Sequence, residues 1–189
     1  LPYTIQNYLA DQITVPRFST ELPEFAEAEK AVQARIDHLM GIKGKKAVDS
    51  IHKELGHIMW EYVGMGRTEE GLKTALKLLK DIRKEFETNL FIPGSTEGVN
   101  IELEKALRLN DFITMGELIA YDALNRNESC GGHFREEYQT EEGEAKRDDE
   151  NYFYVSCWEY QGSDDVAPVL YKEPLVYEAI KVQTRNYKS

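Results

Sequence analysis

The chain of 189 residues is 41% hydrophobic and 30% charged, a composition typical of a globular protein with one good-sized domain or a domain with an appendage. Its net charge of −11 disfavours binding to nucleic acid or to an anionic membrane through bulk charge. No apolar run approaches the ~20 residues of a membrane span, and no signal peptide is visible. Two cysteines, Cys130 and Cys157, argue against a disulfide-stapled secreted scaffold and favour a reducing compartment.

The N-terminal segment predicts two helices separated by a proline break. The sequence opens LPYTIQNYLADQI, without an initiator methionine and with apolar residues at helical spacing, so we expect it to be cut from a longer polypeptide. Residues 1–13 predict a short helix, which ends before Pro16 because the residue before proline avoids helical geometry. Pro23 suits the first turn of a second helix that runs to about Met40. The predicted inward stripe of that helix is Phe25, Ala28, Val32, Ile36 and Leu39.

A helical hairpin within residues 48–89 is the strongest pattern in the chain. The three-and-four spacing of one helical face is followed by Val48, Ile51, His52, Leu55, Ile58, Met59 and Tyr62. Gly64 and Gly66 follow, and they suit a helix end because glycine adopts positive φ at little cost. Thr68 is placed to cap a second helix over residues 69–89, whose acidic first turn complements the helix dipole. The predicted inward stripe of the second helix is Leu72, Ala75, Leu76, Leu79, Ile82 and Phe86.

The last third of the chain changes from helical to extended character. Asn100 is placed to cap a helix over residues 101–125, whose apolar residues cover more than one face. We expect that helix to be covered on several sides, with the C-terminal tail closing over it. The acid-rich residues 128–150 predict a surface loop. Aromatic and β-branched residues predict two or three strands within 152–160 and 166–182, with Pro168 and Pro174 at edges or strand starts.

These patterns predict a mainly α protein. The expected fold is a three-helix-type, spectrin-repeat-like bundle with a C-terminal extended tail that contains two or three short β-strands. The expected divisions are a linker with a short helix at residues 1–23, the helical bundle at 24–127, and a loop followed by a β-rich tail at 128–189.

The segment HKELGH invites comparison with the zinc motif HExxH. That motif needs two histidines four residues apart, so that both lie on one helical face. Here His52 and His57 are five apart, and Glu54 is displaced from the position next to the first histidine. We therefore expect His52 to be a hydrogen-bonded core histidine rather than a metal ligand.

Other candidate sites are also weak. Cys130 and His133 have a gap that suits a metal, but only Cys157 follows as a soft ligand, and a structural zinc needs four. Nothing fixes the separation of the two cysteines for a redox disulfide. The glycines at 41–46 lack the pattern GxxxxGK[ST], and those at 64–71 follow a helix, so neither run predicts a nucleotide loop. The pair Asp148 and Asp149 predicts a solvated face. No catalytic, cofactor-binding or metal-ligating residue is assigned.

The segment HKELGHIMWEYVGMGRTEEGL resembles the C-terminal helical domain of succinate dehydrogenase and fumarate reductase flavoprotein subunits. A second match is NESCGGHFR at residues 127–135, followed by RDDEN at 147–151; the family usually reads ESRGAHxR and then RDDxN. The third match is the strand-like ending at residues 168–187. Cys130 stands where the family commonly has Arg, Gly132 replaces a frequent Ala, and residues 138–146 form a longer stretch than usual. No role of that arginine is carried over.

The resemblance implies a parent enzyme that binds FAD, interconverts succinate and fumarate, and passes electrons to an iron–sulphur subunit. It also implies that the flavin fold and the groups that bind the dicarboxylate precede this domain, so Arg126, Arg135 and Arg147 are not matches to the catalytic arginines. We expect the fragment alone to be inactive and without cofactor.

The same resemblance implies a structural role. We expect the bundle to pack on the preceding flavin-binding domain and the tail to help dock the iron–sulphur subunit. The implied location is cytoplasmic, peripheral to the inner face of the membrane through partner subunits. A domain cut from its neighbours is also expected to expose an apolar patch near its first or last helix.

Three alternatives are weighed against this interpretation. L-aspartate oxidase and adenylylsulphate reductase flavoproteins have a related helical domain, but the tail matches favour the succinate/fumarate branch. A free-standing helical protein-interaction module is disfavoured by the missing methionine and the apolar first helix. A metal-dependent hydrolase built around HKELGH and the Cys130–His133 pair is disfavoured by the spacing of those residues.

Overall fold

A computed structural model describes residues 1–163 and 166–183, and it divides into two compact units, Leu1–Gly41 and Ile42–Ser189. The first unit contains α1 (Pro2–Gln12) and α2 (Pro23–Gly41). The sequence grouped α2 with the bundle, whereas the structure counts it in the N-terminal unit and keeps bundle and tail together in the second. The domain boundaries at 23/24 and 127/128 stay a prediction.

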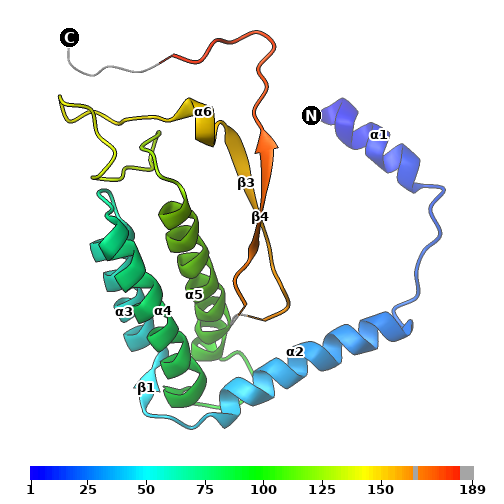
Figure 1. Ribbon diagram of the computed structural model, residues 1–189. Helices are drawn as coiled ribbons and strands as arrows, with labels where there is room; N and C mark the ends of the chain where they lie inside the picture. The colour runs from blue at the N-terminus through cyan, green and yellow to red at the C-terminus, as the bar shows by residue number, and fades with distance from the viewer. Residues whose placement is uncertain (164–165, 184–189) are drawn as a thin grey trace. The chain divides into compact units, whose positions relative to one another are not determined.

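The second unit is built on three helices that run side by side (Figure 1): α3 (Val48–Val63), α4 (Glu69–Asn89) and α5 (Ile101–Asn125). Each helix contacts the other two, so their apolar faces close on a common core. The predicted stripe of α4 is confirmed, because all its members are buried except Leu76, which is half-buried. The mainly α class with a three-helix bundle and a strand-containing tail is therefore confirmed.

Side-chain caps begin two of these helices. Thr68 Oγ1 accepts a hydrogen bond from the Gly71 backbone N at 3.0 Å, and Asn100 Oδ1 accepts one from the Leu103 backbone N at 3.1 Å. Each cap satisfies one of the N–H groups that the first helical turn leaves without a partner. Both predicted caps, and with them the predicted starts of α4 and α5, are confirmed.

The glycine turn between α3 and α4 has a different cause from the one expected. Gly64 has φ −69° and ψ −137°, and neither it nor Gly66 adopts a positive φ. A Cβ atom at Gly64 would instead lie 2.6 Å from the Trp60 carbonyl oxygen, and one at Gly66 would lie 2.8 Å from Glu136 Oε1. At Gly64 the close approach of helix backbone, rather than backbone handedness, requires glycine, whereas the atom nearest Gly66 is the end of a flexible side chain that can move.

A short parallel ladder, which the sequence did not predict, joins the segment before α3 to the segment after α4. β1 (Lys46–Ala47) pairs with β2 (Leu90–Phe91), and the Gly44 backbone N donates to the Leu90 carbonyl at 2.8 Å. A Cβ atom at Gly44 would overlap the backbone of Asn89. Residues 44–47 are therefore held against the end of α4.

The tail forms an antiparallel hairpin of β3 (Tyr154–Glu159) and β4 (Val169–Pro174), preceded by the single turn α6 (Asp149–Tyr152). Figure 1 shows this hairpin beside α5, as the sequence predicted for the tail. Pro168 precedes β4 and Pro174 ends it, because proline cannot donate to a ladder.

Three expectations about exposure are wrong. On α2, Phe25 and Val32 are exposed, because an apolar stripe shows which face a helix can bury but does not supply the partner. On α5, the buried residues follow one face, whereas Phe112, Met115 and Ile119 are exposed at three-and-four spacing. The segment 128–150 is not simply a surface loop, because it contains the buried Glu128, Ser129 and Arg135.

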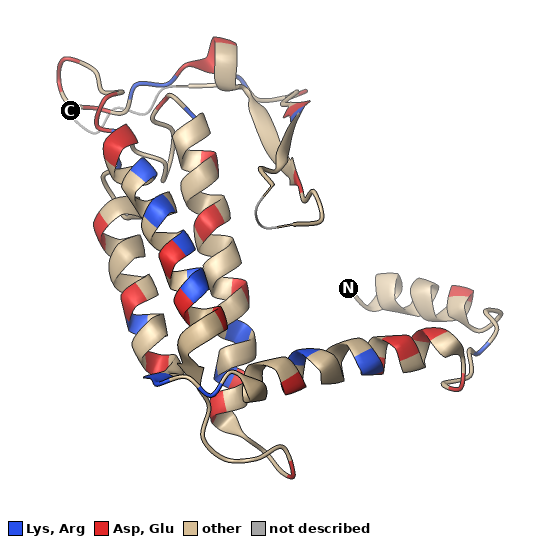
Figure 2. Cartoon of the chain, turned by 60° about the horizontal axis from the view of Figure 1, so that its bottom comes forward, with Lys and Arg blue, Asp and Glu red and all other residues tan. Residues whose placement is uncertain are grey.

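The charges of the bundle are mixed rather than separated. Figure 2 shows lysine and arginine interleaved with aspartate and glutamate along the helices, and α4 carries both signs along its length. Among the described residues, no helix is both long and apolar enough to cross a membrane.

Candidate functional site at the end of the bundle

The glycine turn after α3 pairs with the segment that follows α5. The Arg67 backbone N donates to the Phe134 carbonyl at 3.0 Å, and the Glu136 backbone N donates to the Arg67 carbonyl at 2.9 Å. These two bonds form a parallel bridge between Arg67 and Arg135. Two segments far apart in sequence, which separately carried the family resemblance, are thus one hydrogen-bonded unit at the end of the bundle.

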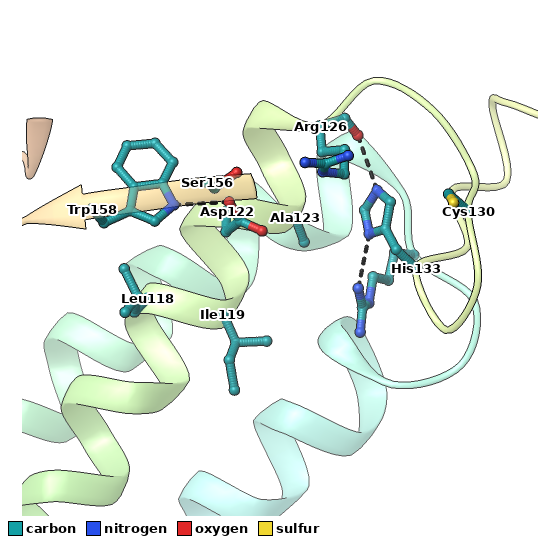
Figure 3. Close-up of a pocket in the computed structure, with 10 residues that line it drawn as sticks. Leu118, Ile119, Asp122, Ala123, Arg126, Cys130, His133, Ser156 and Trp158 are labelled. Carbon is teal, nitrogen blue, oxygen red and sulfur yellow. Dashed lines mark hydrogen bonds between the residues drawn. The ribbon is translucent and has the colours of Figure 1, made fainter. Parts of the chain in front are cut away.

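His133 is held at both ring nitrogens, as Figure 3 shows for its bond to Arg126. Nε2 lies 3.0 Å from the Arg126 carbonyl, and Nδ1 lies 2.9 Å from Arg67 Nη1. A carbonyl only accepts and a guanidinium only donates, so Nε2 carries the hydrogen and Nδ1 accepts. Burial lowers the pKa of His133, and the charges of three arginines lower it further, against an opposing bond to the Arg126 carbonyl. The imidazole is therefore held in its neutral form.

Arg67 anchors this unit to α3. Its Nε donates to the carbonyls of Val63 and Gly64, at 3.0 and 3.2 Å, which satisfies orphan acceptors at the end of the helix. Burial lowers the pKa of Arg67, and the charge of Asp122 opposes that shift. Its hydrogen-bond partners are two carbonyls and a neutral imidazole, and no described carboxylate forms an ion pair with it.

A cavity of about 430 Å³ opens beside this unit, between the end of α5, the following loop and β3 (Figure 3). Trp158 lies on its β3 side, and the indole Nε1 donates to Asp122 Oδ1 at 2.8 Å. The residues that line the cavity are Arg67, Leu118, Ile119, Asp122, Ala123, Arg126, Cys130, His133, Ser156 and Trp158. Arg67, Arg126 and His133 thus line the same cavity as several apolar side chains.

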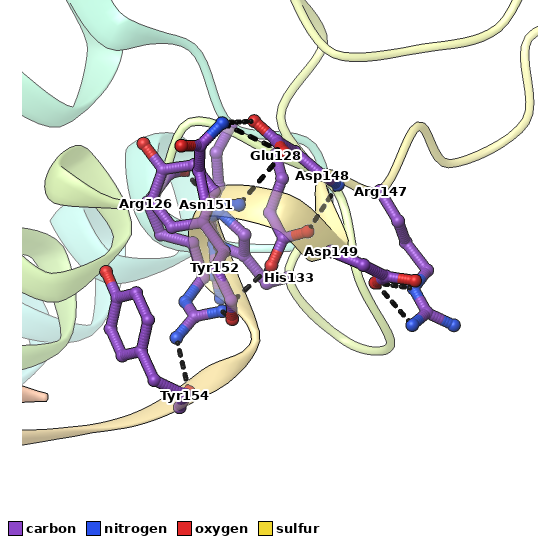
Figure 4. Close-up of polar contacts among 10 residues, drawn as sticks. Arg126, Glu128, His133, Arg147, Asp148, Asp149, Asn151, Tyr152 and Tyr154 are labelled. Carbon is purple, nitrogen blue, oxygen red and sulfur yellow. Dashed lines mark hydrogen bonds and ion pairs between the residues drawn. The ribbon is translucent and has the colours of Figure 1, made fainter. Parts of the chain in front are cut away.

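Arg126 lies on the other side of this cavity. It donates to the carbonyls of Tyr152 and Tyr154, both at 3.1 Å, and its guanidinium lies over both aromatic rings. These contacts fasten the start of β3 to the end of α5 (Figure 4). Arg126 therefore positions the tail.

Glu128 joins the two halves of the second family motif (Figure 4). The side chain is 2% exposed, and its two oxygens accept from Arg126 Nη1 and from the Asp148 backbone N, each at 2.8 Å. Asp148 in turn caps α6 by accepting from the Asn151 backbone N at 3.2 Å. A buried carboxylate needs such partners, because an unpaired buried charge is costly.

Arg135 closes the C-terminal end of α5. The residue is wholly buried, and its Nη1 donates to the Ala123 carbonyl at 3.0 Å. Its backbone N donates to Ser129 Oγ at 2.8 Å, while its Nε pairs with Glu137 at 3.1 Å. A guanidinium at this position satisfies helix carbonyls and complements the negative end of the helix dipole.

Both histidines of HKELGH are exposed on α3. His52 is exposed and stacks on Phe112, with ring centroids 5.4 Å apart, so the expectation of a hydrogen-bonded core histidine is wrong. The stripe predicted for α3 buries its aliphatic members and leaves this edge uncovered. In the part of the chain that the structure describes, no group of three or more His, Cys, Asp or Glu residues could hold a metal.

The remaining sequence candidates are Cys130 with His133, Cys157, and the pair Asp148 and Asp149. Cys130 and Cys157 are free and exposed. Cys130 and His133 exchange backbone hydrogen bonds of 2.8 and 3.0 Å across a tight turn, and both ring nitrogens of His133 are occupied. Asp148 caps a helix, and Asp149 accepts from Arg147 Nε at 2.9 Å.

The sequence did not single out Arg67. Arg126 and Arg135 were named only as residues that do not match catalytic arginines. An arginine placed directly after a glycine turn, between two helices of a strongly acidic chain, is the signal that could have drawn attention to it.

Comparison with known families decides the relationship of the chain. Residues 52–187 match the model of the family described as fumarate reductase flavoprotein C-term. The chain belongs to this family. Both segments of the hydrogen-bonded unit lie within the matched range, so the unit is part of the family domain.

Individual relatives are similar over only part of their own length. A fumarate reductase flavoprotein subunit of Proteus vulgaris is 29% identical over 148 residues, which cover 76% of this chain and 24% of that protein. An uncharacterized FAD-dependent oxidoreductase of Methanocaldococcus jannaschii is 31% identical over 112 residues, 59% of this chain and 20% of that protein. A chloroplastic L-aspartate oxidase of Nicotiana tabacum is 37% identical over 88 residues, which cover 47% of this chain and 13% of that protein. The chain thus spans a quarter or less of these relatives.

Solved structures share the fold. A variant of quinol fumarate reductase from E. coli superposes with a TM-score of 0.69 and 21% identity, covering 91% of this chain and 28% of that one. A quinol–fumarate reductase solved with menaquinol molecules gives a TM-score of 0.71 and 22% identity, covering 88% and 27%.

Proposed function

We propose that this chain is the C-terminal helical domain of the flavoprotein subunit of a succinate dehydrogenase or fumarate reductase. In this proposal the parent binds FAD, interconverts succinate and fumarate, and passes electrons to an iron–sulphur subunit. The domain itself has no catalytic, cofactor-binding or metal-binding residue, and it is inactive alone.

The observation that carries the proposal is the hydrogen-bonded unit between the Gly64–Arg67 turn and residues 128–135. In this unit the polar groups of the two most distinctive family segments form hydrogen bonds with each other, which supports a structural role rather than a catalytic one. Arg67 and His133 satisfy backbone groups and each other, Arg135 caps α5, and Glu128 ties the loop to α6. Such an arrangement supports a rigid packing element.

We further propose where this element packs. The exposed Phe112, Met115 and Ile119 on α5 form an apolar face suited to burial against the preceding flavin-binding domain. The tail would help dock the iron–sulphur subunit, which would place the protein in the cytoplasm at the inner face of the membrane through its partner subunits.

The test uses the 189-residue chain beside its longer parent. The chain is expected neither to bind FAD in a fluorescence titration nor to reduce fumarate with a reduced dye as electron donor, whereas the parent does both. Flavin binding or fumarate reduction by the chain alone would refute the inert role. A coding sequence with no flavin-binding segment upstream of Leu1 would refute the parent.

The similarity to an L-aspartate oxidase supports a second candidate, a helical domain of that type. Steady-state oxidation of L-aspartate and of succinate by the parent separates the two. Turnover of L-aspartate with no succinate oxidation would replace the first candidate by the second.

A further inference from the structure

The guanidinium of Arg67 has hydrogen-bonding capacity that the fold does not use. Its Nε–H is shared by the carbonyls of Val63 and Gly64, and one hydrogen of Nη1 reaches His133. Within the described part of the chain, no atom accepts from its other three N–H groups. Arginine has five such donors in a fixed planar fork, so three remain at the lining of the 430 Å³ cavity.

The surroundings of this fork favour a negative charge. Arg67, Arg135 and Arg126 all lower the pKa of His133, so the potential at the imidazole is positive. Arg126 directs three of its five donors to Glu128 and to two carbonyls of the tail, and the Nη2 of Arg135 is buried without a partner. Among the described residues that line the cavity, Arg67 keeps the largest number of unused guanidinium donors.

The opposite wall limits how much negative charge the cavity accepts. Asp122 lines it and accepts from Trp158 at 2.8 Å, and its charge acts on Arg67. A second negative charge close to Asp122 is repelled, so a monoanion fits better than a dianion such as phosphate. Ile119 and Ala123 give an apolar floor that suits a short hydrocarbon stem.

We propose that this cavity binds a carboxylate group, which pairs with the unused N–H groups of Arg67 while its stem lies against Ile119 and Trp158. A carboxylate matches the guanidinium fork in geometry and carries a single charge. The group comes either from a small carboxylic acid or from an aspartate or glutamate side chain. The inference does not depend on the proposed function, because it rests on the unused donors of Arg67 and on the lining of the cavity.

The test is a titration followed by NMR of the ¹⁵N-labelled chain, reading the arginine Nε–Hε signals. Acetate is expected to shift the Arg67 signal saturably, with a Kd on the order of 10 mM for so small a ligand. Arg147 is the matched control, because it is an arginine outside the cavity and already pairs with Asp149. An Arg67 signal that moves no more than that of Arg147, or that responds equally to chloride or phosphate at the same ionic strength, would overturn the proposal.

Two further arms identify the residue and the source. Arg67→Lys keeps the charge but lacks the fork and is expected to weaken acetate binding at least tenfold, read at the His133 ring, whereas Arg147→Lys leaves it unchanged. Unweakened binding to a folded R67K chain would overturn the proposal; if that variant does not fold, the wild-type titration decides. N-acetylglutamate methylamide, which mimics a protein side chain, binds tighter than acetate if the source is a protein and no tighter if it is a small acid.

Discussion

Gly44 and Gly56 offer the same substitution in opposite surroundings. At Gly44 an added methyl group would overlap the backbone of Asn89, so the connection must move away from the end of α4. That movement breaks two backbone hydrogen bonds, Gly44 N to Leu90 O at 2.8 Å and Lys45 N to Asn89 O at 2.9 Å. At about 1 kcal/mol for each bond, plus the strain of displaced backbone, Gly44→Ala is expected to lower the free energy of unfolding by about 2–4 kcal/mol.

Gly56 lies in the middle of α3, where nothing surrounds the added methyl group within 4 Å. Alanine is a better helix former than glycine, so Gly56→Ala is expected to raise the free energy of unfolding by about 0.5–1 kcal/mol. Urea denaturation followed by circular dichroism measures both variants. With a slope of about 2 kcal/mol per molar urea, their midpoints should differ by about 1.3–2.5 M. A Gly44→Ala midpoint at or above that of the wild type would refute the close approach of Gly44 to the backbone of Asn89.

Variants at three more positions probe the end of the bundle by the same denaturation assay. Glu128→Gln removes the buried negative charge beside Arg126 and should cost about 3 kcal/mol; a cost below ~1 kcal/mol would show that the buried pair is not needed. Thr68→Ala removes the cap of α4 and should cost about 1 kcal/mol, whereas Thr68→Asp should keep most of it. Because the folded pKa of His133 is lowered, the unfolded chain takes up its proton first as pH falls. The stability lost by His133→Gln should therefore be full above pH of about 6.5 and shrink below it; a loss that does not vary with pH would contradict this assignment.

The helices were predictable because their signals are local. Thr68 and Asn100 sit directly before apolar residues at helical spacing, and the caps and the buried stripe of α4 follow from that order. The β3–β4 hairpin followed from composition in the same way. Periodicity does not reveal which helical faces have a partner. The exposure of Phe112 on α5 was therefore not predicted.

The site was not predictable from spacing because it is made by contacts between distant residues. The charged character of residues 128–150 predicted a solvated loop, yet Glu128 and Arg135 are buried beside hydrogen-bonding groups that folding brings to them. Arg67 and His133 are 66 positions apart, so neither reveals the other in the sequence. The family resemblance indicated that both segments matter. The structure shows that they are hydrogen-bonded to each other.

The bridge between the glycine turn and the later loop also sets an order of events during synthesis. At about 5–20 residues per second, a ribosome takes roughly 3–13 seconds to add the stretch that separates Arg67 from His133. α4 is itself synthesised within that interval, and the Arg67 turn lacks its partner segment and its histidine until the interval ends. The pairing of the Arg67 turn with residues 133–136 is therefore a late step on the translating chain. A nascent chain stalled before residue 128 would expose the Arg67 guanidinium without its His133 partner.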